Sequence, residues 1–318
     1  MPILRRLPYS ISLHVNPDHL RLTAIHKQPI WKRPDIRKGN TVHSGRGSVA
    51  ASVVKQRAFI EGAGLSSPQD DTETPVLYTH TLCPYAHRAW LAFLEKGVEF
   101  QPVQIDLSRK PAYFSTISTS GLVPAVAYKG AVVTESLDIC RWVDETFDGL
   151  ELVPADKKSR DAMEALVLAA SRINAAGLNL LAGRGSRSWG IGSGQSDGQQ
   201  QGLEQQLQIL ARALQVGGGP YLTGPTVTLA DIVLFPFIER FALCAPRHAG
   251  YDVQAACGGA IGQWLDVMSA RQSCMVSCAN SDALLQAYSK HGSLDFFDFH
   301  TYRAQDLHPH LDKVKASA

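Results

Sequence analysis

One cysteine of this chain, Cys83, occupies a position at which its sulfur could act as a nucleophile. It follows a strand-like segment at 76–79 and begins the hexapeptide CPYAHR, in which Pro84 falls at the first position of a predicted helix. Cys83 is therefore expected at the N-cap, beside the unpaired backbone N–H groups of the first turn. Those donors and the positive end of the helix dipole favour a thiolate, so we expect a lowered thiol pKa and a reactive sulfur.

The residue three positions after Cys83 is Ala86, so this helix offers no second cysteine to resolve a disulfide. Any redox cycle at Cys83 must then be completed by an external thiol. The alternative is a buried core cysteine, which is a common fate of this residue type. The strand–Cys-Pro–helix context favours the reactive interpretation.

The elements that would position Cys83 alternate regularly within residues 75–149, which we take as a first domain. Apolar periodicity predicts the order β-α-β-α-β-β-α. The predicted segments are strand 76–79, helix 84–96, strand 98–106, helix 111–117, strands 125–128 and 131–134, and a helix from 135. A βαβ crossover followed by a hairpin is the order of the thioredoxin fold.

Residues 152–280 predict an all-helical second domain, because no convincing strand recurs there. Long helices are expected at 156–182 and 202–216, and a capping box formed by Thr228 and Asp231 begins another. The Gly-, Ser- and Gln-rich stretch 183–202 is expected to be a flexible insertion, and 281–318 a C-terminal extension.

Residues 1–72 have the composition of a disordered basic leader. The first 60 residues hold eleven Lys or Arg but two acids, whereas the net charge of the whole chain is +2. An Arg-rich, acid-poor and serine-containing N-terminus is typical of organelle transit peptides. We expect import into the plastid (chloroplast), with the mitochondrion or the cytosol as alternatives, and an ordinary basic tail as the other interpretation.

The composition also bears on partners. The chain that follows the basic first 60 residues is mildly acidic, so it has no general attraction for nucleic acid. The sequence contains no run of eighteen apolar residues, so we expect no insertion into a membrane. Six cysteines are too sparse for a disulfide scaffold, which favours a reducing compartment. Cys274 and Cys278 share a helix face but fit no metal-site spacing, so we expect buried cysteines and no metal.

Several short motifs occur in an order that resembles a cysteine-type glutathione transferase. They are CPYAHR at 83–88, IDL and KP within 105–111, LVPA at 122–125, ESLD at 135–138, and TLADI leading to PFIERF within 228–241. The resemblance covers roughly residues 75–275 and is strongest to the plant lambda class, with the omega and dehydroascorbate reductase classes as near relatives. It implies a thioredoxin-like α/β domain followed by an all-α domain, with glutathione as co-substrate.

The resemblance also assigns roles around the sulfur. It implies that Cys83 is the nucleophile and that the ring of Tyr85 lies beside it. It implies that Pro124 follows a cis peptide bond, which turns the backbone of Val123 toward the cysteinyl amide of glutathione. Only about 5% of X–Pro bonds are cis, so the sequence alone would not show this feature.

The same family pattern places the two ends of glutathione. Lys110 meets the glycyl carboxylate, while Glu135 and Ser136 hold the γ-glutamyl group at a helix N-terminus. Taken alone, Lys110 could be a surface lysine, and the Glu-Ser pair a helix cap. His87 could tune the thiolate, but we expect it to be an exposed residue of the second helical turn.

A cysteine at this position can attack sulfur and form a mixed disulfide with glutathione. We therefore expect glutathione-dependent thiol transfer or reduction of a small aromatic or oxidised acceptor, with dehydroascorbate among the candidates. One alternative is a non-catalytic carrier of glutathione and aromatic ligands, with an apolar wall of Phe235, Phe237 and Phe241, although their spacing also fits a helix core. Another is a redox-gated, membrane-associating protein, against which the lack of a long apolar first helix counts.

Overall fold

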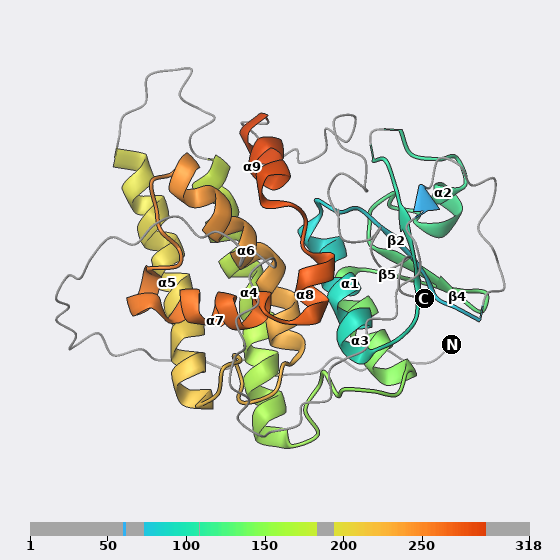
Figure 1. Cartoon of the computed structure of the whole chain (residues 1–318), viewed down its shortest axis with the longest axis horizontal. Coiled ribbons are helices and arrows are strands. Elements are labelled where there is room, and N and C mark those ends of the chain that lie inside the picture. Colours follow the sequence, from blue (N-terminus) through green and yellow to red (C-terminus); the bar gives the residue numbers. More distant parts are fainter. Residues whose placement is uncertain (1–59, 62–72, 108, 183–193, 291–318) are drawn as a thin grey trace, which may run out of the picture. The chain divides into compact units, whose positions relative to one another are not determined.

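The computed structural model describes residues 60–61, 73–107, 109–182 and 194–290 (Figure 1). Its sheet has the strand order β1-β3-β2-β4-β5. The strands are β1 (Ile60–Glu61), β2 (Val76–Thr79), β3 (Gln101–Gln104), β4 (Ala125–Tyr128) and β5 (Ala131–Thr134). Strand β3 runs parallel to β1 and β2, whereas β4 is antiparallel to both β2 and β5.

Three helices complete the α/β half, and they are α1 (Pro84–Lys96), α2 (Phe114–Ile117) and α3 (Ser136–Thr146). The observed order β2-α1-β3-α2-β4-β5-α3 confirms the predicted thioredoxin-like arrangement. Successive side chains of a strand point to opposite faces of the sheet. Leu77 accordingly joins the core under α1 and α3, while its neighbour Tyr78 packs with Phe114 of α2 on the other face.

The predicted leader extends too far toward the C-terminus. Ile60 and Glu61 form a strand that pairs with Val103 and Gln104 of β3, so this piece of the basic N-terminal region belongs to the sheet. Two residues are too short for apolar periodicity to reveal them. The remainder of the predicted leader, 1–59 and 62–72, lies outside the described residues.

The second half of the described chain is helical, as predicted. Its helices are α4 (Lys157–Ala182), α5 (Gly194–Gly217), α6 (Leu229–His248), α7 (Ala260–Ser269), α8 (Gln272–Ser277) and α9 (Ser281–Lys290), with a 3-10 turn at Ala256–Gly259. Helix α5 begins at Gly194, so the prediction of a flexible insertion is wrong for 194–202, and 183–193 lie outside the described residues. No described helix is long and apolar enough to cross a membrane.

The predicted C-terminal extension also begins with ordered structure. Helix α9 packs against α6, and its Leu284 is fully buried in a cluster with Leu82 and Cys244. Leu82 immediately precedes the candidate nucleophile. The start of the extension therefore supports the loop that carries Cys83.

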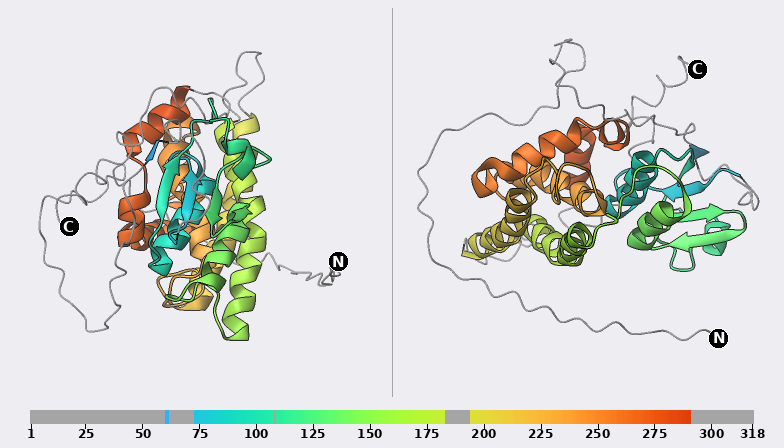
Figure 2. Two further views of the ribbon diagram at one scale, coloured as in Figure 1. Left: turned by 90° about the vertical axis from the view of Figure 1, so that its right-hand side faces the viewer. Right: turned by 90° about the horizontal axis from the view of Figure 1, so that it is seen from below.

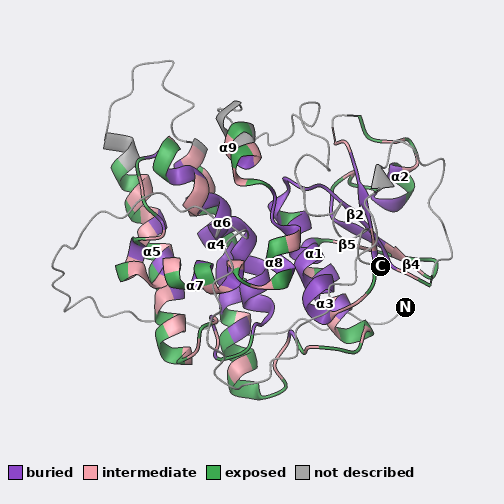
Figure 3. Ribbon diagram, in the orientation of Figure 1, coloured by how far each residue is buried: buried purple, intermediate pink, exposed green. Residues whose placement is uncertain are grey.

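A continuous core joins the two halves. Helix α1 packs against α6 and α8 as well as α3, and the right-hand view of Figure 2 shows the two halves side by side. Figure 3 shows that burial is concentrated along α1, α4 and α6. Phe235, Phe237 and Phe241 of α6 are at most 1% exposed, so they are core residues and offer no open aromatic wall.

Asp144 fixes the chain where it passes from the α/β half to the helical half. Its carboxylate accepts hydrogen bonds from the backbone N–H groups of Leu152 (2.9 Å) and Val153 (3.0 Å). It also pairs with the buried ammonium of Lys96 at 2.7 Å. Charge-assisted hydrogen bonds of this kind are strong, so the linker is held in one place against α1.

Candidate active site

Cys83 is the N-cap residue of α1, as its sequence context predicted. Its sulfur accepts a hydrogen bond from the backbone N–H of Ala86 at 3.5 Å. Its thiol can donate to the carbonyl oxygen of Val123, which lies 4.0 Å away. Pro84 occupies the first turn of the helix, where its fixed φ suits the geometry.

The sulfur lines a cavity of about 510 Å³, which we call the Cys83 pocket. All seven residues that the sequence assigned to the site line this pocket, and they are Cys83, Tyr85, Lys110, Val123, Pro124, Glu135 and Ser136. They come from the start of α1, the loop after β3, the start of β4 and the start of α3. The structure therefore brings the whole predicted set together.

Backbone geometry shapes two sides of the Cys83 pocket. The Val123–Pro124 peptide bond is cis, as the family resemblance implied. Glu135 has a φ of +68°, which is costly for a residue other than glycine. Such strained positions cluster at functional sites, which supports a functional interpretation of Glu135 over a simple helix cap.

The lowered pKa predicted for the Cys83 thiol is wrong. Burial raises this pKa, because the residue is only 4% exposed and a thiolate would lose its hydration. The N–H groups of Ala86 and Tyr85 and the guanidinium groups of Arg240 and Arg88 act in the opposite direction, but they do not outweigh the burial. The helix N-terminus thus limits the cost of the thiolate without making it the favoured form.

This pKa gives a prediction for the pH dependence of alkylation. A thiol becomes nucleophilic as it ionises, so a pKa above the usual range of a cysteine keeps the thiolate fraction rising with pH throughout the neutral and mildly alkaline range. We expect the rate of iodoacetamide labelling at Cys83, followed by peptide mass mapping, to increase about 50- to 100-fold from pH 7 to pH 9. A rate that is already level at pH 7 would show that the thiol pKa is lowered after all.

His87 is buried, so the expectation of an exposed side chain is wrong. Its Nε2 atom lies 2.9 Å from the hydroxyl of Ser277, and its Nδ1 atom lies 3.3 Å from the guanidinium of Arg240. Both partners lie in the helical half, on α8 and α6. His87 therefore helps to connect α1 with the second half of the protein.

Arg88 is a site residue that the sequence analysis did not assign. It is 4% exposed, its Nε donates to the Val233 carbonyl at 2.8 Å, and its Nη1 donates to the Ser136 hydroxyl at 3.4 Å. Its guanidinium lies 5.1 Å from the ring centroid of Tyr85 and 4.7 Å from that of Phe237. Arg88 thus links α1, where it contacts Tyr85, with Ser136 at the start of α3 and with Val233 of α6.

The other cysteines stay away from this chemistry. All six cysteines are free, and Cys140, Cys244, Cys274 and Cys278 are buried as predicted, whereas Cys257 is half-buried in the turn before α7. Burial raises the pKa of both Cys140 and Cys244 to about 12. Among the described residues, no group of three His, Cys, Asp or Glu side chains could hold a metal ion.

The fold and the site define a class of protein: a thioredoxin-like domain with an N-cap cysteine beside a cis proline, followed by a helical domain. Two family descriptions match the chain, "Glutathione S-transferase, N-terminal domain" at residues 82–146 and "Glutathione S-transferase, C-terminal domain" at 175–267. The chain belongs to the glutathione S-transferase family and is an enzyme of that family.

Its relatives include plant proteins of the lambda type. Glutathione S-transferase L3 of Arabidopsis thaliana is 30% identical over 58% of this chain and 77% of its own length. The Arabidopsis protein "Glutathione S-transferase L2, chloroplastic" is 27% identical over 67% of this chain and 69% of its own. The crystal structure of glutathione transferase Omega 3C from Trametes versicolor is similar with a TM-score of 0.58 and 27% identity, over 67% of this chain and 91% of its own.

Proposed function

We propose that this protein is a glutathione-dependent thiol transferase and reductase in which Cys83 is the nucleophile. The observation that carries the proposal is a cysteine sulfur in one pocket with the six other predicted glutathione-binding residues. A serine or tyrosine there would activate the thiol of glutathione, whereas a cysteine can form a disulfide with it. Because Ala86 stands where a resolving cysteine would be, an external thiol must complete the cycle.

The proposed reaction has two thiol–disulfide exchanges. The Cys83 thiolate attacks the glutathionyl sulfur of a mixed disulfide RS–SG, which releases RSH after protonation and leaves Cys83–S–SG. The thiolate of a second glutathione then attacks the glutathione sulfur of this adduct, giving oxidised glutathione and free Cys83. The sum is RS–SG + GSH → RSH + GSSG: the RS sulfur is reduced to a thiol and the sulfur of the added glutathione is oxidised to a disulfide, so no metal or flavin is required.

The Cys83 pocket offers a partner for each part of glutathione. The backbone of Val123, before Pro124, faces the cysteinyl amide, and the Lys110 ammonium takes the glycyl carboxylate as a point charge. Ser136 and the backbone N–H groups at the N-terminus of α3 take the γ-glutamyl carboxylate, because a helix N-terminus attracts anions. The carboxylate of Glu135 can meet the ammonium of the same group. With these three partners, we expect the sulfur of bound glutathione to lie at Cys83.

The acceptor approaches from the open side of the pocket. Tyr85 is 44% exposed and stands edge-on to Phe237 with 4.9 Å between ring centroids, and Leu122 at the rim is 59% exposed. These apolar surfaces suit a small aromatic or oxidised acceptor. Dehydroascorbate is a candidate, since its reduction to ascorbate would convert two glutathione molecules into one oxidised glutathione.

We further propose that the enzyme acts in the plastid. The basic, acid-poor first 60 residues have the composition of a transit peptide, and one Arabidopsis relative carries the word "chloroplastic" in its name. Since β1 belongs to the sheet, a processing site would have to precede Ile60. A fusion of residues 1–59 to a fluorescent protein should enter plastids in plant cells, and a cytosolic signal would contradict this.

The experiment that tests the proposed chemistry is the intact mass of the full chain after incubation with oxidised glutathione. Wild type should gain one glutathione, reduced glutathione should remove it, and Cys83→Ser should gain none at this site. A folded wild-type protein that binds glutathione without forming the adduct would overturn the thiol-transfer proposal. That result would favour a non-catalytic carrier of glutathione and aromatic ligands.

A further inference from the structure

A second cavity adjoins the Cys83 pocket on the side of the helical half. It has a volume of about 450 Å³, and we call it the α4 pocket. Tyr85, Glu135 and Ser136 line both cavities, so the two meet at the start of α3. Cys83 does not line the α4 pocket, so a group bound there would lie away from the reacting sulfur.

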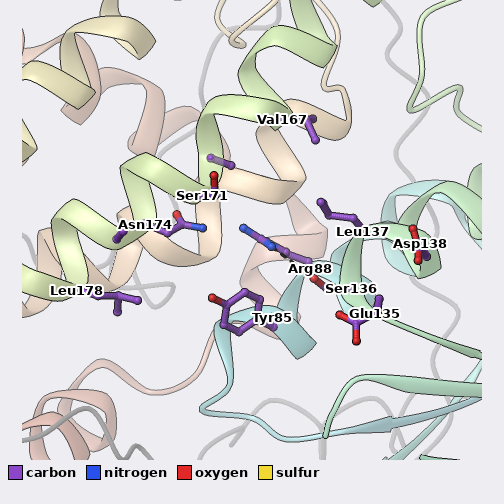
Figure 4. Close-up of a pocket in the computed structure, with 12 residues that line it drawn as sticks. Tyr85, Arg88, Glu135, Ser136, Leu137, Asp138, Val167, Ser171, Asn174 and Leu178 are labelled. Atoms are coloured by element: carbon purple, nitrogen blue, oxygen red, sulfur yellow. Dashed lines mark hydrogen bonds between the residues drawn. The ribbon is translucent and has the colours of Figure 1, made fainter. Parts of the chain in front are cut away.

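Two buried polar side chains line the α4 pocket from opposite halves of the protein. Arg88 comes from α1, and Asn174 comes from α4; each is only 4% exposed. In Figure 4, Arg88 lies between Asn174 on one side and Ser136 on the other. The pocket is thus polar at its centre, although Val167 and Ala170 of α4 give it an apolar wall.

Asn174 has unmet hydrogen-bonding capacity, and Arg88 carries a buried charge. The Asn174 Oδ1 atom is buried and has no hydrogen-bond partner among the described residues. A buried acceptor without a donor is costly, which points to a ligand N–H or O–H group at this place. Arg88 forms no ion pair with a carboxylate in the described part of the chain, and burial lowers its pKa to about 10 because desolvation disfavours the charged guanidinium.

The two groups together fit one ligand chemistry. A guanidinium binds a carboxylate, and an amide oxygen accepts from an ammonium group. The exposed carboxylates of Glu135 and Asp138 at the edge of the pocket add attraction for a cation. A carboxylate and an ammonium on neighbouring atoms form the head of an α-amino acid, and glutathione carries such a head on its γ-glutamyl residue.

We propose that the α4 pocket receives the amino-acid head of glutathione, with its carboxylate toward Arg88 and Ser136 and its ammonium toward Asn174 Oδ1. This inference rests on the proposed function, because it extends the glutathione site from the α/β half into the helical half. Asn174 is then a positioning residue that selects thiols with a free γ-glutamyl head. Arg88 serves twice, since it also holds the Ser136 hydroxyl at the junction of the two pockets.

The test compares disulfides that differ only at this head. The full-length protein is mixed with glutathione disulfide, with cysteinylglycine disulfide, which lacks the γ-glutamyl group, or with N-acetylglutathione disulfide, which lacks the ammonium. The initial rate of adduct formation on Cys83 is measured by intact mass. The variants are Asn174→Leu, Asn174→Asp and the matched control Asn179→Leu, which makes the same change at an exposed position of α4 that lines neither pocket.

We expect Asn174→Leu to lower the rate with glutathione disulfide at least tenfold and to change the rate with cysteinylglycine disulfide less than twofold. Asn174→Asp should keep the rate with glutathione disulfide and discriminate more strongly against the N-acetyl form, because its carboxylate attracts an ammonium. Asn179→Leu should match wild type with all three disulfides. The unchanged rate with cysteinylglycine disulfide shows that each variant is folded.

Two results would overturn the inference while leaving the proposed function intact. Asn174→Leu could lower all three rates equally, which would indicate a structural role, or it could lower none of them. A wild-type protein that forms no adduct with any of the disulfides would instead refute the thiol-transfer chemistry, and the inference would fall with it. The outcomes therefore distinguish the two proposals.

Discussion

Cys83→Ser is expected to lower glutathione-dependent reduction of a mixed disulfide on the order of a thousandfold or more, down to the uncatalysed background. A serine oxygen cannot attack a disulfide and later leave as a thiolate does, so both exchanges lose their protein intermediate. The assay follows oxidised glutathione produced from reduced glutathione and the cysteine–glutathione mixed disulfide. A variant that retains more than a tenth of the wild-type rate would show that Cys83 is not the nucleophile.

The matched control is Cys257→Ser, which removes a half-buried thiol that does not line the Cys83 pocket. Its turnover should equal that of wild type. Cys83→Ser should also gain activity in a second reaction, the conjugation of glutathione to an aromatic halide. The serine hydroxyl at the N-cap of α1 can donate to the thiolate of bound glutathione and no longer competes for it as a disulfide partner.

The fold was predictable because local signals determine most of it. Pro84 at the first helical position, Gly97 at the end of α1 and the turn at Lys129–Gly130 mark where elements begin and end. Strand β1 was not predicted, because it is two residues long and is defined by its pairing with β3. The first turns of α5 were not predicted, because they consist mostly of Gly, Ser and Gln and show no apolar periodicity. The packing of the later turns supports the helix.

The site was predictable as a set of positions and much less as an environment. The motif order brought seven residues to one pocket, but Cys83 is buried in a cluster with residues distant in sequence, such as Ile117 and Val123. The predicted direction of the thiol pKa failed for that reason. His87 and Arg88 likewise acquire their partners, Ser277 and Val233, from helices more than 140 residues away.

Asn174 shows the same limit more sharply. In the sequence Asn174 is one of several polar residues in a long predicted helix. Nothing in its neighbouring residues distinguishes it from Asn179 of the same helix, which is exposed. Its significance arises because α4 faces α1 and α3 across a cavity. Sequence motifs identify residues on the element that carries the nucleophile, whereas recognition by the second half becomes visible from the packed structure.

A different buried group, Asp231, connects three segments of the helical half. Its Oδ1 atom accepts from the backbone N–H of Leu222 and from the indole N–H of Trp264, each at 2.9 Å. Its Oδ2 atom accepts from the backbone N–H of Thr228 at 2.9 Å, which completes the predicted capping box at the start of α6. Burial raises the pKa of the Asp231 carboxyl, so the accepted hydrogen bonds, more than the charge, explain its presence in the core.

Asp231→Ala is therefore expected to destabilise the protein by about 3 to 5 kcal/mol, because it leaves buried N–H donors from Leu222, Thr228 and Trp264 without an acceptor. That loss corresponds to a decrease of roughly 6 to 20 °C in the thermal midpoint for a protein of this size class. Asp231→Asn should lose less than half as much, since its amide oxygen keeps the Leu222 and Trp264 bonds and its neutrality suits a buried site.

The matched control for this measurement is Asp266→Ala, which removes an exposed carboxylate from α7. It should change the midpoint by no more than about 2 °C, because surface substitutions away from specific contacts have small effects. The thermal midpoint of each variant is measured by circular dichroism during heating. Equal shifts for Asp231→Ala and Asp266→Ala would contradict the role of the Asp231 hydrogen bonds. A large shift for Asp231→Ala alone would show that the stability of the protein depends on the hydrogen bonds that Asp231 accepts.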